Sequence, residues 1–275
     1  MMLGDISEDT CDRGRTTILA DVGNSMVKLA VLSGVRQGMP CLQSRYNLDS
    51  HDFNCKDFEN WLMSVAPVSA EFYVASVYET AAACLETSIS AVSASRNLSV
   101  RKQRVLFSQL PIEITTEHPE HVGIDRLAAA TAASRLALPS RGSIVIDCGT
   151  AVSVDLVSPD RQFLGGAILP GPSLLSRLLA DGTSLLPEVL SLAEALPAMP
   201  GRSTNSAIIA GIGFGLRGAV CRLVDEARRK IDAEVDVFLT GGWRGAVRGE
   251  ILSVQESPDL VLSGIGIAPI EICGL

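Results

Sequence analysis

Residues 21–28, which read DVGNSMVK, combine in one short segment the groups that bind a phosphate. Gly23 lacks a Cβ, so an anion can come within hydrogen-bonding distance of the backbone N–H groups of a turn at this point. The Asp21 carboxylate can orient the water shell of Mg²⁺, and Lys28 adds a positive charge. An ordinary β-hairpin with a capped turn would show the same residues, so a single segment leaves both interpretations open.

A second segment repeats this arrangement in the other half of the chain. Residues 17–32 read TILADVGNSMVKLAVL and residues 143–157 read SIVIDCGTAVSVDLV, so that Asp147 matches Asp21. Thr150 offers a hydroxyl and a backbone N–H suited to the β- and γ-phosphates, and Asp147 could hold a second cation. Each segment is typical of a strand, a tight turn and a strand. The repetition favours phosphate binding and predicts a duplicated domain with a ligand between its halves.

Two further segments could complete such a site. The pair Gly241-Gly242 follows a predicted strand, where a base or ribose could lie against bare backbone, although glycine pairs end many strands. Asp125 stands in the sequence GIDR at the head of an alanine-rich stretch. It could take a proton from an attacking hydroxyl, or it could be a first-turn residue that the helix dipole stabilises. We expect the dipole to keep this carboxylate ionised, and the sequence leaves the two roles open.

Layered α/β elements must position these segments. Hydrophobic spacing and the positions of proline and glycine predict helices near 55–66, 79–94, 125–138, 172–180, 205–230 and 260–272, and strands near 71–77, 104–107 and 235–240. We expect a polar leader over residues 1–16, an N-terminal domain over 17–140 and a C-terminal domain over 141–275. The last helix could pack back on the first domain.

Composition argues against several classes of protein. The net charge is −8 and Lys and Arg gather only in short runs, which argues against a nucleic-acid partner. The seven cysteines are scattered without a CxxC pair, as expected for reduced thiols in a cytoplasm. No apolar run approaches membrane-spanning length, so we expect no membrane association. The chain has no GxxxxGKS/T motif, which excludes a P-loop kinase.

Two other patterns favour structural roles. Residues 213–218 match GxGxxG, but the dinucleotide-binding fingerprint requires a strand directly before the first glycine. Small residues recur here every four positions from Ala207 to Ala219, which predicts one face of a continuous helix packed on the sheet or on a partner. The pair His118 and His121 has a proline between its members and no third ligand nearby, so a loop surface is favoured over a metal site.

The ordered set of motifs resembles type III pantothenate kinase, a branch of the fold shared by acetate kinase, sugar kinases, Hsp70 and actin. That family carries DxGNTxxK, GxDR, DxGTAxTxD, GGxIxPG and TGG in this order. This chain has DVGNSMVK, GIDR, DCGTAVSVD, GGAILPG and TGG. The resemblance implies an α/β fold of two duplicated actin-like (ribonuclease H-like) domains with a nucleotide cleft between them.

The resemblance also implies a reaction, the ATP-dependent phosphorylation of the primary alcohol of pantothenate, which is the first step of coenzyme A synthesis. Asp125 would accept the proton, Asp21 would hold Mg²⁺ through water, and Asp147 would bind the K⁺ or NH₄⁺ that the family requires. The ATP contacts would be Asp21, Val22, Gly23, Asn24, Ser25, Met26, Val27, Lys28, Thr150, Gly241 and Gly242. The pantothenate contacts would be Gly123, Ile124, Asp125, Arg126 and Thr204. Family members are homodimers with the substrate pocket near the subunit interface, so we expect a cytoplasmic homodimer.

The chain departs from the family pattern at several positions. Ser25 and Ser153 replace threonines and keep the hydroxyl, whereas Arg202 and Ser203 replace the Lys and Asn of a GKNT segment. Thr116 stands where the family usually has a tyrosine, so an aromatic contact to the substrate is missing. Two alternatives therefore stay open: a non-catalytic accessory or regulatory protein of the same fold, and a kinase of another small alcohol.

Overall fold

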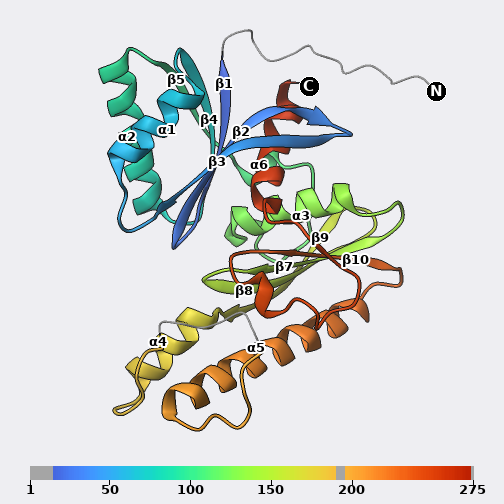
Figure 1. Ribbon diagram of the computed structural model, residues 1–275. Helices are drawn as coiled ribbons and strands as arrows, with labels where there is room; N and C mark the ends of the chain where they lie inside the picture. Colours follow the sequence, from blue (N-terminus) through green and yellow to red (C-terminus); the bar gives the residue numbers. More distant parts are fainter. Residues whose placement is uncertain (1–14, 190–195, 274–275) are drawn as a thin grey trace, which may run out of the picture. The chain divides into compact units, whose positions relative to one another are not determined.

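The chain folds into two compact units. The computed structural model describes residues 15–189 and 196–273. The first unit comprises the described residues up to Leu110 and resumes at Ile265, and the second comprises Pro111–Gly264 (Figure 1).

The predicted domain boundary near residue 140 falls inside the second unit. The reason is that helix α3 (Ile124–Leu136) packs on strands β7 (Gly142–Cys148) and β8 (Ala151–Val157) of that unit. The predicted leader, residues 1–16, lies outside the described residues except at its end, where strand β1 begins at Thr16.

The first unit is built on a five-stranded sheet. Its strands are β1 (Thr16–Val22), β2 (Met26–Arg36), β3 (Met39–Asp49), β4 (Ser69–Ser76) and β5 (Ser99–Arg104), in the order β3-β2-β1-β4-β5. The β1–β2 and β2–β3 pairs are antiparallel, and the β1–β4 and β4–β5 pairs are parallel.

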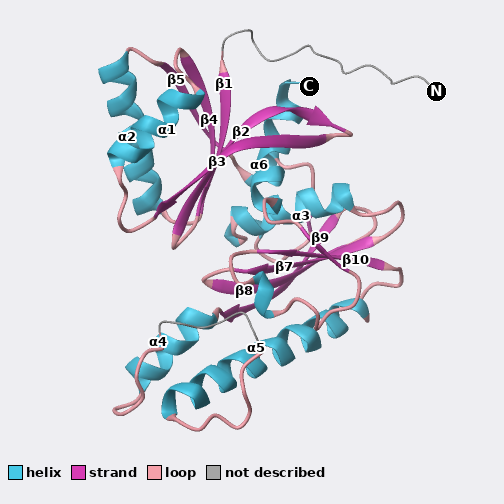
Figure 2. Ribbon diagram, viewed as in Figure 1, coloured by secondary structure: helices cyan, strands magenta, loops and turns pink. Residues whose placement is uncertain are grey.

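Helices cover both faces of this sheet. Helices α1 (Cys55–Val65) and α2 (Glu79–Arg96) lie together on one face (Figure 2), where Phe58 and Leu85 join a core of alternate strand residues. Part of α6 (Leu260–Cys273) packs on the other face, where Gly266 lies against Leu19. The sheet therefore holds the end of β1, where Asp21 lies, between two layers.

The second unit repeats this topology. Its strands are β6 (Glu113–Ile114), β7, β8, β9 (Gln162–Pro170), β10 (Val235–Thr240) and β11 (Val254–Glu256), in the order β11-β10-β7-β8-β9-β6. The β7–β8 and β8–β9 pairs are antiparallel, whereas β7–β10 and β10–β11 are parallel, so β7 to β11 match the five strands of the first sheet. The duplication predicted from the sequence is confirmed: the chain has a duplicated actin-like α/β fold.

Two long helices sandwich the second sheet. Helix α5 (Thr204–Arg228) packs through Leu216, Val220 and Val224 on one face, and α3 lies on the other (Figure 1). Because side chains alternate along a strand, Asp147, Ser153 and Asp155 share the face toward α3. Helix α4 (Pro172–Gly182) packs on α5. Short 3₁₀ turns lie at Phe107–Gln109, Pro119–His121 and Arg244–Ala246.

The predicted helices are confirmed to within a few residues, and two other expectations are wrong. The strand expected near 104–107 lies earlier, at Ser99–Arg104. Its sequence, SVRKQR, is rich in charged residues and lacks the alternation of apolar and polar side chains by which a half-buried strand is predicted. The sequence was also expected to contain no apolar run long enough to span a membrane. Helix α5 does have the length and composition of a membrane-spanning helix, and 39% of its most apolar 18-residue window is buried. Its packing on the second sheet accounts for the buried part.

Candidate functional site

The first Asp-turn joins β1 to β2. Asp21 is the penultimate residue of β1 and pairs across the hairpin with Lys28, whose Nζ lies 3.5 Å from the Asp21 Oδ2. The backbone N–H of Gly23 closes the turn by donating to the Met26 carbonyl at 3.0 Å. Asn24, which follows, is exposed. The turn therefore presents polar groups and one cation at the end of a buried strand.

A residue that the sequence did not single out holds this turn in place. The Ser50 hydroxyl donates to the Gly23 carbonyl at 2.8 Å, and the Ser50 backbone N–H donates to the Ser25 carbonyl at 3.0 Å. Ser50 follows strand β3, and no motif marks it. The side chains of Val22 and Val27, both predicted ATP contacts, belong to the core of the first unit, so only their backbone could meet a ligand.

The second Asp-turn joins β7 to β8 and is enclosed by other motifs. The Gly171 backbone N–H donates to the Thr150 carbonyl at 2.9 Å. A Cβ on Gly171 would lie 2.3 Å from the Gly149 carbonyl oxygen, so this position requires glycine. The final glycine of GGAILPG therefore packs directly on the DCGT turn.

The TGG segment closes the other side of the same turn. Gly241 has φ of +90°, and a Cβ there would lie 2.5 Å from Asp147 Oδ1 and 2.4 Å from the Cys148 carbonyl oxygen. The Trp243 backbone N–H donates to that carbonyl at 2.8 Å. Three motifs that lie far apart in sequence thus meet at the second Asp-turn.

The thiol within this turn is inert. Cys148 is fully buried, and burial together with the charge of Asp147 raises the pKa of its thiol to about 12. The thiolate is the nucleophilic form of cysteine, so Cys148 takes no part in covalent chemistry near neutral pH.

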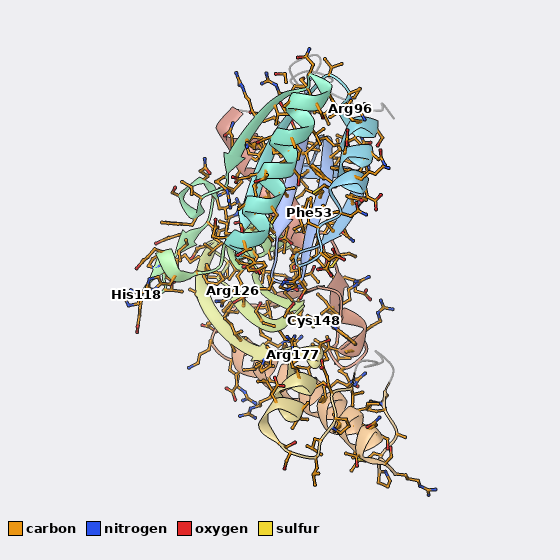
Figure 3. The ribbon with its side chains drawn as sticks, turned by 90° about the vertical axis from the view of Figure 1, so that its left-hand side faces the viewer. Phe53, Arg96, His118, Arg126, Cys148 and Arg177 are labelled. Carbon is orange, nitrogen blue, oxygen red and sulfur yellow. The ribbon has the colours of Figure 1, made fainter. Side chains whose placement is uncertain are left out.

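A buried ion pair joins GIDR to the second Asp-turn segment. Arg126 donates from Nε to both oxygens of Asp155, at 3.0 and 3.2 Å, and its Nη2 also contacts the carboxylate. Ser153 donates to Asp155 Oδ2 at 2.8 Å, and the guanidinium lies 5.5 Å from the ring centroid of Phe163. Figure 3 labels Arg126 and Cys148 within the second unit. The pair fixes the start of α3 to β8.

This pairing bears on the role expected of Arg126. The resemblance implied that Arg126 contacts the substrate, and the structure shows its guanidinium paired with Asp155, a residue that the site prediction omitted. The signal was present, since Asp155 is the last residue of the DxGTAxTxD motif. Arg126 therefore links the first turn of α3, which carries Asp125, to Asp155 on β8.

Asp125 differs electrostatically from the expectation. Burial raises the pKa of the Asp125 carboxyl above its ordinary value, and the nearby charge of Asp155 acts in the same direction. The Arg126 backbone N–H, which donates to Asp125 Oδ1 at 2.8 Å, and the Arg126 charge lower the pKa without outweighing burial. We expected the helix dipole to favour the ionised form. A carboxylate with a raised pKa is the stronger proton acceptor, which suits a general base.

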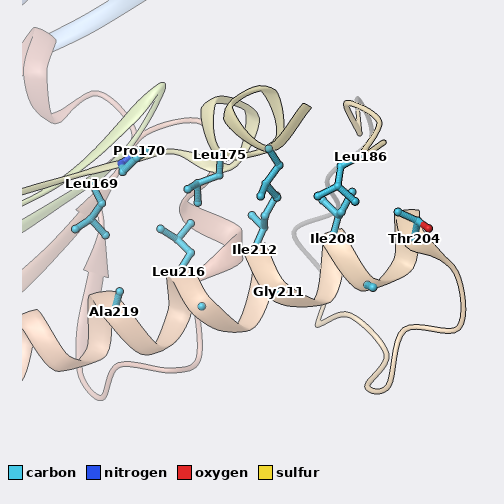
Figure 4. Close-up of a pocket in the computed structure, with 13 residues that line it drawn as sticks. Leu169, Pro170, Leu175, Leu186, Thr204, Ile208, Gly211, Ile212, Leu216 and Ala219 are labelled. Carbon is cyan, nitrogen blue, oxygen red and sulfur yellow. The ribbon is translucent and has the colours of Figure 1, made fainter. Parts of the chain in front are cut away.

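Other predicted contacts lie at different places in the second unit. Gly123 is the N-cap residue of α3, and Ile124 follows it. Thr204 begins α5 and lines an apolar groove between α4 and α5 (Figure 4). The Thr116 hydroxyl is buried and has no hydrogen-bond partner among the described residues.

The donor atoms at the two turns suit hard cations. Asp147 is partly exposed, and its turn also carries the hydroxyl of Thr150, so oxygen ligands of the kind that K⁺ or Mg²⁺ prefers lie on one turn. Asp21 is 5% exposed and has Lys28 beside it. A cation at Asp21 therefore fits best through an intervening water.

Comparison with known proteins agrees with these motifs. The chain is 38% identical over 150 residues to a type III pantothenate kinase of Halorhodospira halophila and 41% identical over 145 residues to one of Alkalilimnicola ehrlichii. These segments cover 54% and 52% of this chain but only 57% of each relative. A structure titled a conserved putative Baf family transcriptional activator from Campylobacter jejuni matches 94% of this chain and 100% of its own, with a TM-score of 0.56 and 20% identity. That likeness shows the fold alone.

The family model for type III pantothenate kinase matches residues 17–226, which contain both Asp-turns, the GIDR segment and the GGAILPG segment. On this match, the chain belongs to the type III pantothenate kinase family.

Proposed function

We propose that this protein transfers the γ-phosphoryl group of ATP to the primary alcohol of pantothenate, the first step of coenzyme A biosynthesis. The observation that carries the proposal is the Arg126–Asp155 pair. Through this pair the first turn of α3, where the pKa of Asp125 is raised, is held against the strand that follows the second Asp-turn. Membership of the family supports the choice of reaction.

In this proposal the two Asp-turns bind the phosphates of one ATP. The backbone of Val22 to Val27 and the Lys28 ammonium would contact the phosphates from the first turn, and Thr150 would contact them from the second. Gly241 and Gly242 would leave room for the ribose or base, since Gly242 is exposed and a Cβ there would meet nothing within 4 Å.

Cations complete the nucleotide site in the proposal. Asp21 would hold Mg²⁺ through water, and Asp147 would hold K⁺ or NH₄⁺. Bound cations neutralise the charge that develops on a transferring phosphoryl group, which is most of what catalysis of this reaction requires. This local charge is needed because the chain as a whole carries a net charge of −8.

Asp125 would act as the general base. The substrate hydroxyl oxygen forms a bond to the γ-phosphorus while the bond from that phosphorus to the β,γ-bridging oxygen breaks. The hydroxyl proton passes to Asp125, and ADP leaves. The first turn of α3, with Gly123, Ile124 and Arg126, would line the pantothenate site, and Arg126 would act chiefly by fixing Asp125 through Asp155.

A second copy of this chain would cover the groove between α4 and α5. This groove measures about 660 Å³ and is lined by apolar residues, several of which point toward one another across it (Figure 4). The small residues Gly211 and Gly215 line it, and a Cβ on either would meet nothing within 4 Å. A symmetric copy of α5 could therefore approach closely, and Thr204, which lines the same groove, would lie at the subunit interface.

The homodimer has a direct test. Gly211→Arg should convert the protein to a monomer in sedimentation analysis without unfolding it, whereas Gly211→Ala should leave a dimer. A wild-type monomer, or a dimer that survives Gly211→Arg, contradicts this interface. We also propose a cytoplasmic location without membrane or nucleic-acid partners.

The test of the reaction is coupled ADP release with a panel of primary alcohols, with and without K⁺. ADP release that requires both pantothenate and K⁺ is the expected result. Release with a different alcohol would identify another small-alcohol kinase, and no release with any alcohol would identify a non-catalytic accessory protein. Either of these results contradicts the proposal.

A further inference from the structure

Three side chains with metal-binding atoms gather at the 3₁₀ turn Pro119–His121. His118 is the N-cap residue of this turn, Glu120 lies within it, and His121 ends it. One ligand atom from each residue lies within 4.8 Å of those of the other two. This is the one such group of three among the residues that the structure describes.

The distances between these groups leave room for an ion. The His118 Nδ1 lies 3.4 Å from the Glu120 Oε1, and the His121 Nε2 lies 4.0 Å from the same oxygen. The two imidazole rings are 5.3 Å apart between centroids and inclined by 37°. Ligands about 2.0–2.2 Å from a tetrahedral Zn²⁺ lie about 3.3–3.6 Å apart, so the His118–Glu120 distance already fits and the His121 side chain must move a little closer.

The sequence interpretation rejected this site because a proline interrupts the histidine pair and no third ligand was evident. The structure removes both objections. A 3₁₀ turn has about three residues per turn, so residues three apart lie on the same side, and proline is accepted at its first position. Glu120, between the histidines, offers a third ligand atom.

We propose that His118, Glu120 and His121 bind a divalent late-transition metal ion, Zn²⁺ above all. Two imidazoles and one carboxylate are the donor set that favours Zn²⁺ over Mg²⁺ or K⁺. All three side chains are more than half exposed, and Figure 3 shows His118 at the margin of the molecule. The fourth position is therefore open to water.

The metal site takes no part in the proposed kinase reaction, but it lies close in sequence to the proposed general base. His121 lies two residues before Gly123, the N-cap of α3, and Asp125 is in the first turn of that helix. A bound ion would tie together both ends of the turn that leads into α3. It would thus restrict the backbone that presents Asp125, whatever substrate the protein accepts.

The test is the binding of Zn²⁺ to the tag-free full chain by calorimetry. We expect one Zn²⁺ per chain, with binding at least tenfold weaker in His118→Ala, His121→Ala and Glu120→Gln. The chain has only three histidines, so His51→Ala is the matched control and should bind like the wild type. Equal binding by His118→Ala and the wild type, or no stoichiometric binding at all, overturns the proposal.

Two further readouts separate this site from adventitious binding to cysteines. The Co²⁺ complex should lack the intense near-ultraviolet band of a thiolate ligand, because the site offers only nitrogen and oxygen. Zn²⁺ should slow amide hydrogen exchange in peptides that contain residues 118–123. A thiolate band, or protection confined to other segments, contradicts the assignment.

Discussion

The two Asp-turns have the same topology and different surroundings. In the first, Asp21 pairs across its hairpin with Lys28, and the turn is held from one side by Ser50. In the second, Asp147 pairs across its hairpin with Ser153, and glycines of two other motifs pack directly on the turn. The first turn thus offers a cation and exposed polar groups, whereas the second offers a carboxylate without a lysine in the matching position.

The difference indicates a division of labour after duplication. A turn with a lysine suits the negative phosphates, and a turn whose carboxylate faces a neutral serine suits a cation. The second unit also carries the Arg126–Asp155 pair and Asp125, so the proposed general base belongs to that unit. On this interpretation, Lys28 of the first unit acts on nucleotide affinity, Asp125 and Arg126 of the second unit act on turnover and stability, and Thr150 of the second unit shares in nucleotide binding.

The largest expected effect is on turnover. Asp125→Asn removes the proton acceptor and should lower kcat by about 10²–10⁴ while nearly preserving ATP affinity, since general-base catalysis contributes that range. Steady-state kinetics and ATP calorimetry measure the two quantities. Asp160→Asn, at an exposed turn of the same unit, is the matched control. An unimpaired rate in Asp125→Asn contradicts the base assignment.

The next effect is on stability. Arg126→Met leaves the Asp155 carboxylate, which is only 1% exposed, without its partner, and removing one member of a buried pair costs about 3–5 kcal/mol. Urea unfolding should show this loss. Arg126→Lys keeps the charge but loses the fork geometry, so we expect an intermediate loss. A stability equal to that of the wild type would mean that the pair does not fix α3 to β8.

A smaller effect tests the first turn. Lys28→Met should raise the KM for ATP roughly tenfold or more, because a hydrogen bond to a charged group contributes about 1.5–3 kcal/mol. The kcat should change little. Lys56→Met, on α1 of the same unit, serves as the control. If Lys28→Met lowered kcat and left the KM unchanged, the proposed division between the turns would be wrong.

A still smaller effect concerns the residue that braces the first turn. Ser50→Ala removes the hydrogen bond to the Gly23 carbonyl, and an ordinary hydrogen bond contributes about 0.5–1.5 kcal/mol. We expect a loss of stability in this range and a modest rise in the KM for ATP. A purely structural brace would change the stability alone.

The smallest expected effect is a gain in stability from Asp125→Asn near neutral pH. The pKa of Asp125 is raised in the folded protein, so its ionised form destabilises the fold at every pH above that raised value. The difference in Tm between variant and wild type should shrink as the pH falls toward about 3.9, the ordinary aspartate value. A variant that is less stable than the wild type at pH 7 contradicts the burial argument.

The sequence predicted the fold well because its signals are local. The repeated Asp-turns gave the duplication, and apolar spacing gave the helices. Strand β5 was predicted a few residues too late. Its sequence, SVRKQR, lacks the alternation of apolar and polar residues that marks a half-buried strand. The division at Leu110 could not be predicted either, since it depends on α3 packing against β7 and β8.

The candidate site was predicted in its motifs and not in its contacts. Asp155, Phe163 and Ser50 act through tertiary contacts that no local pattern encodes. The direction of the Asp125 pKa depends on burial, whereas the sequence showed only a helix start. The metal-binding geometry at His118 depends on a 3₁₀ turn that the proline concealed.

The central claim is that both Asp-turns bind the same nucleotide. Calorimetric titration of ATP into the wild type, Lys28→Met, Thr150→Ala and the double variant tests it most directly. We predict one ATP per chain, weaker binding in each single variant, and a double variant whose loss differs from the sum of the two, as for groups that share one ligand. Two ATP per chain, or wild-type affinity in Thr150→Ala, would contradict the account.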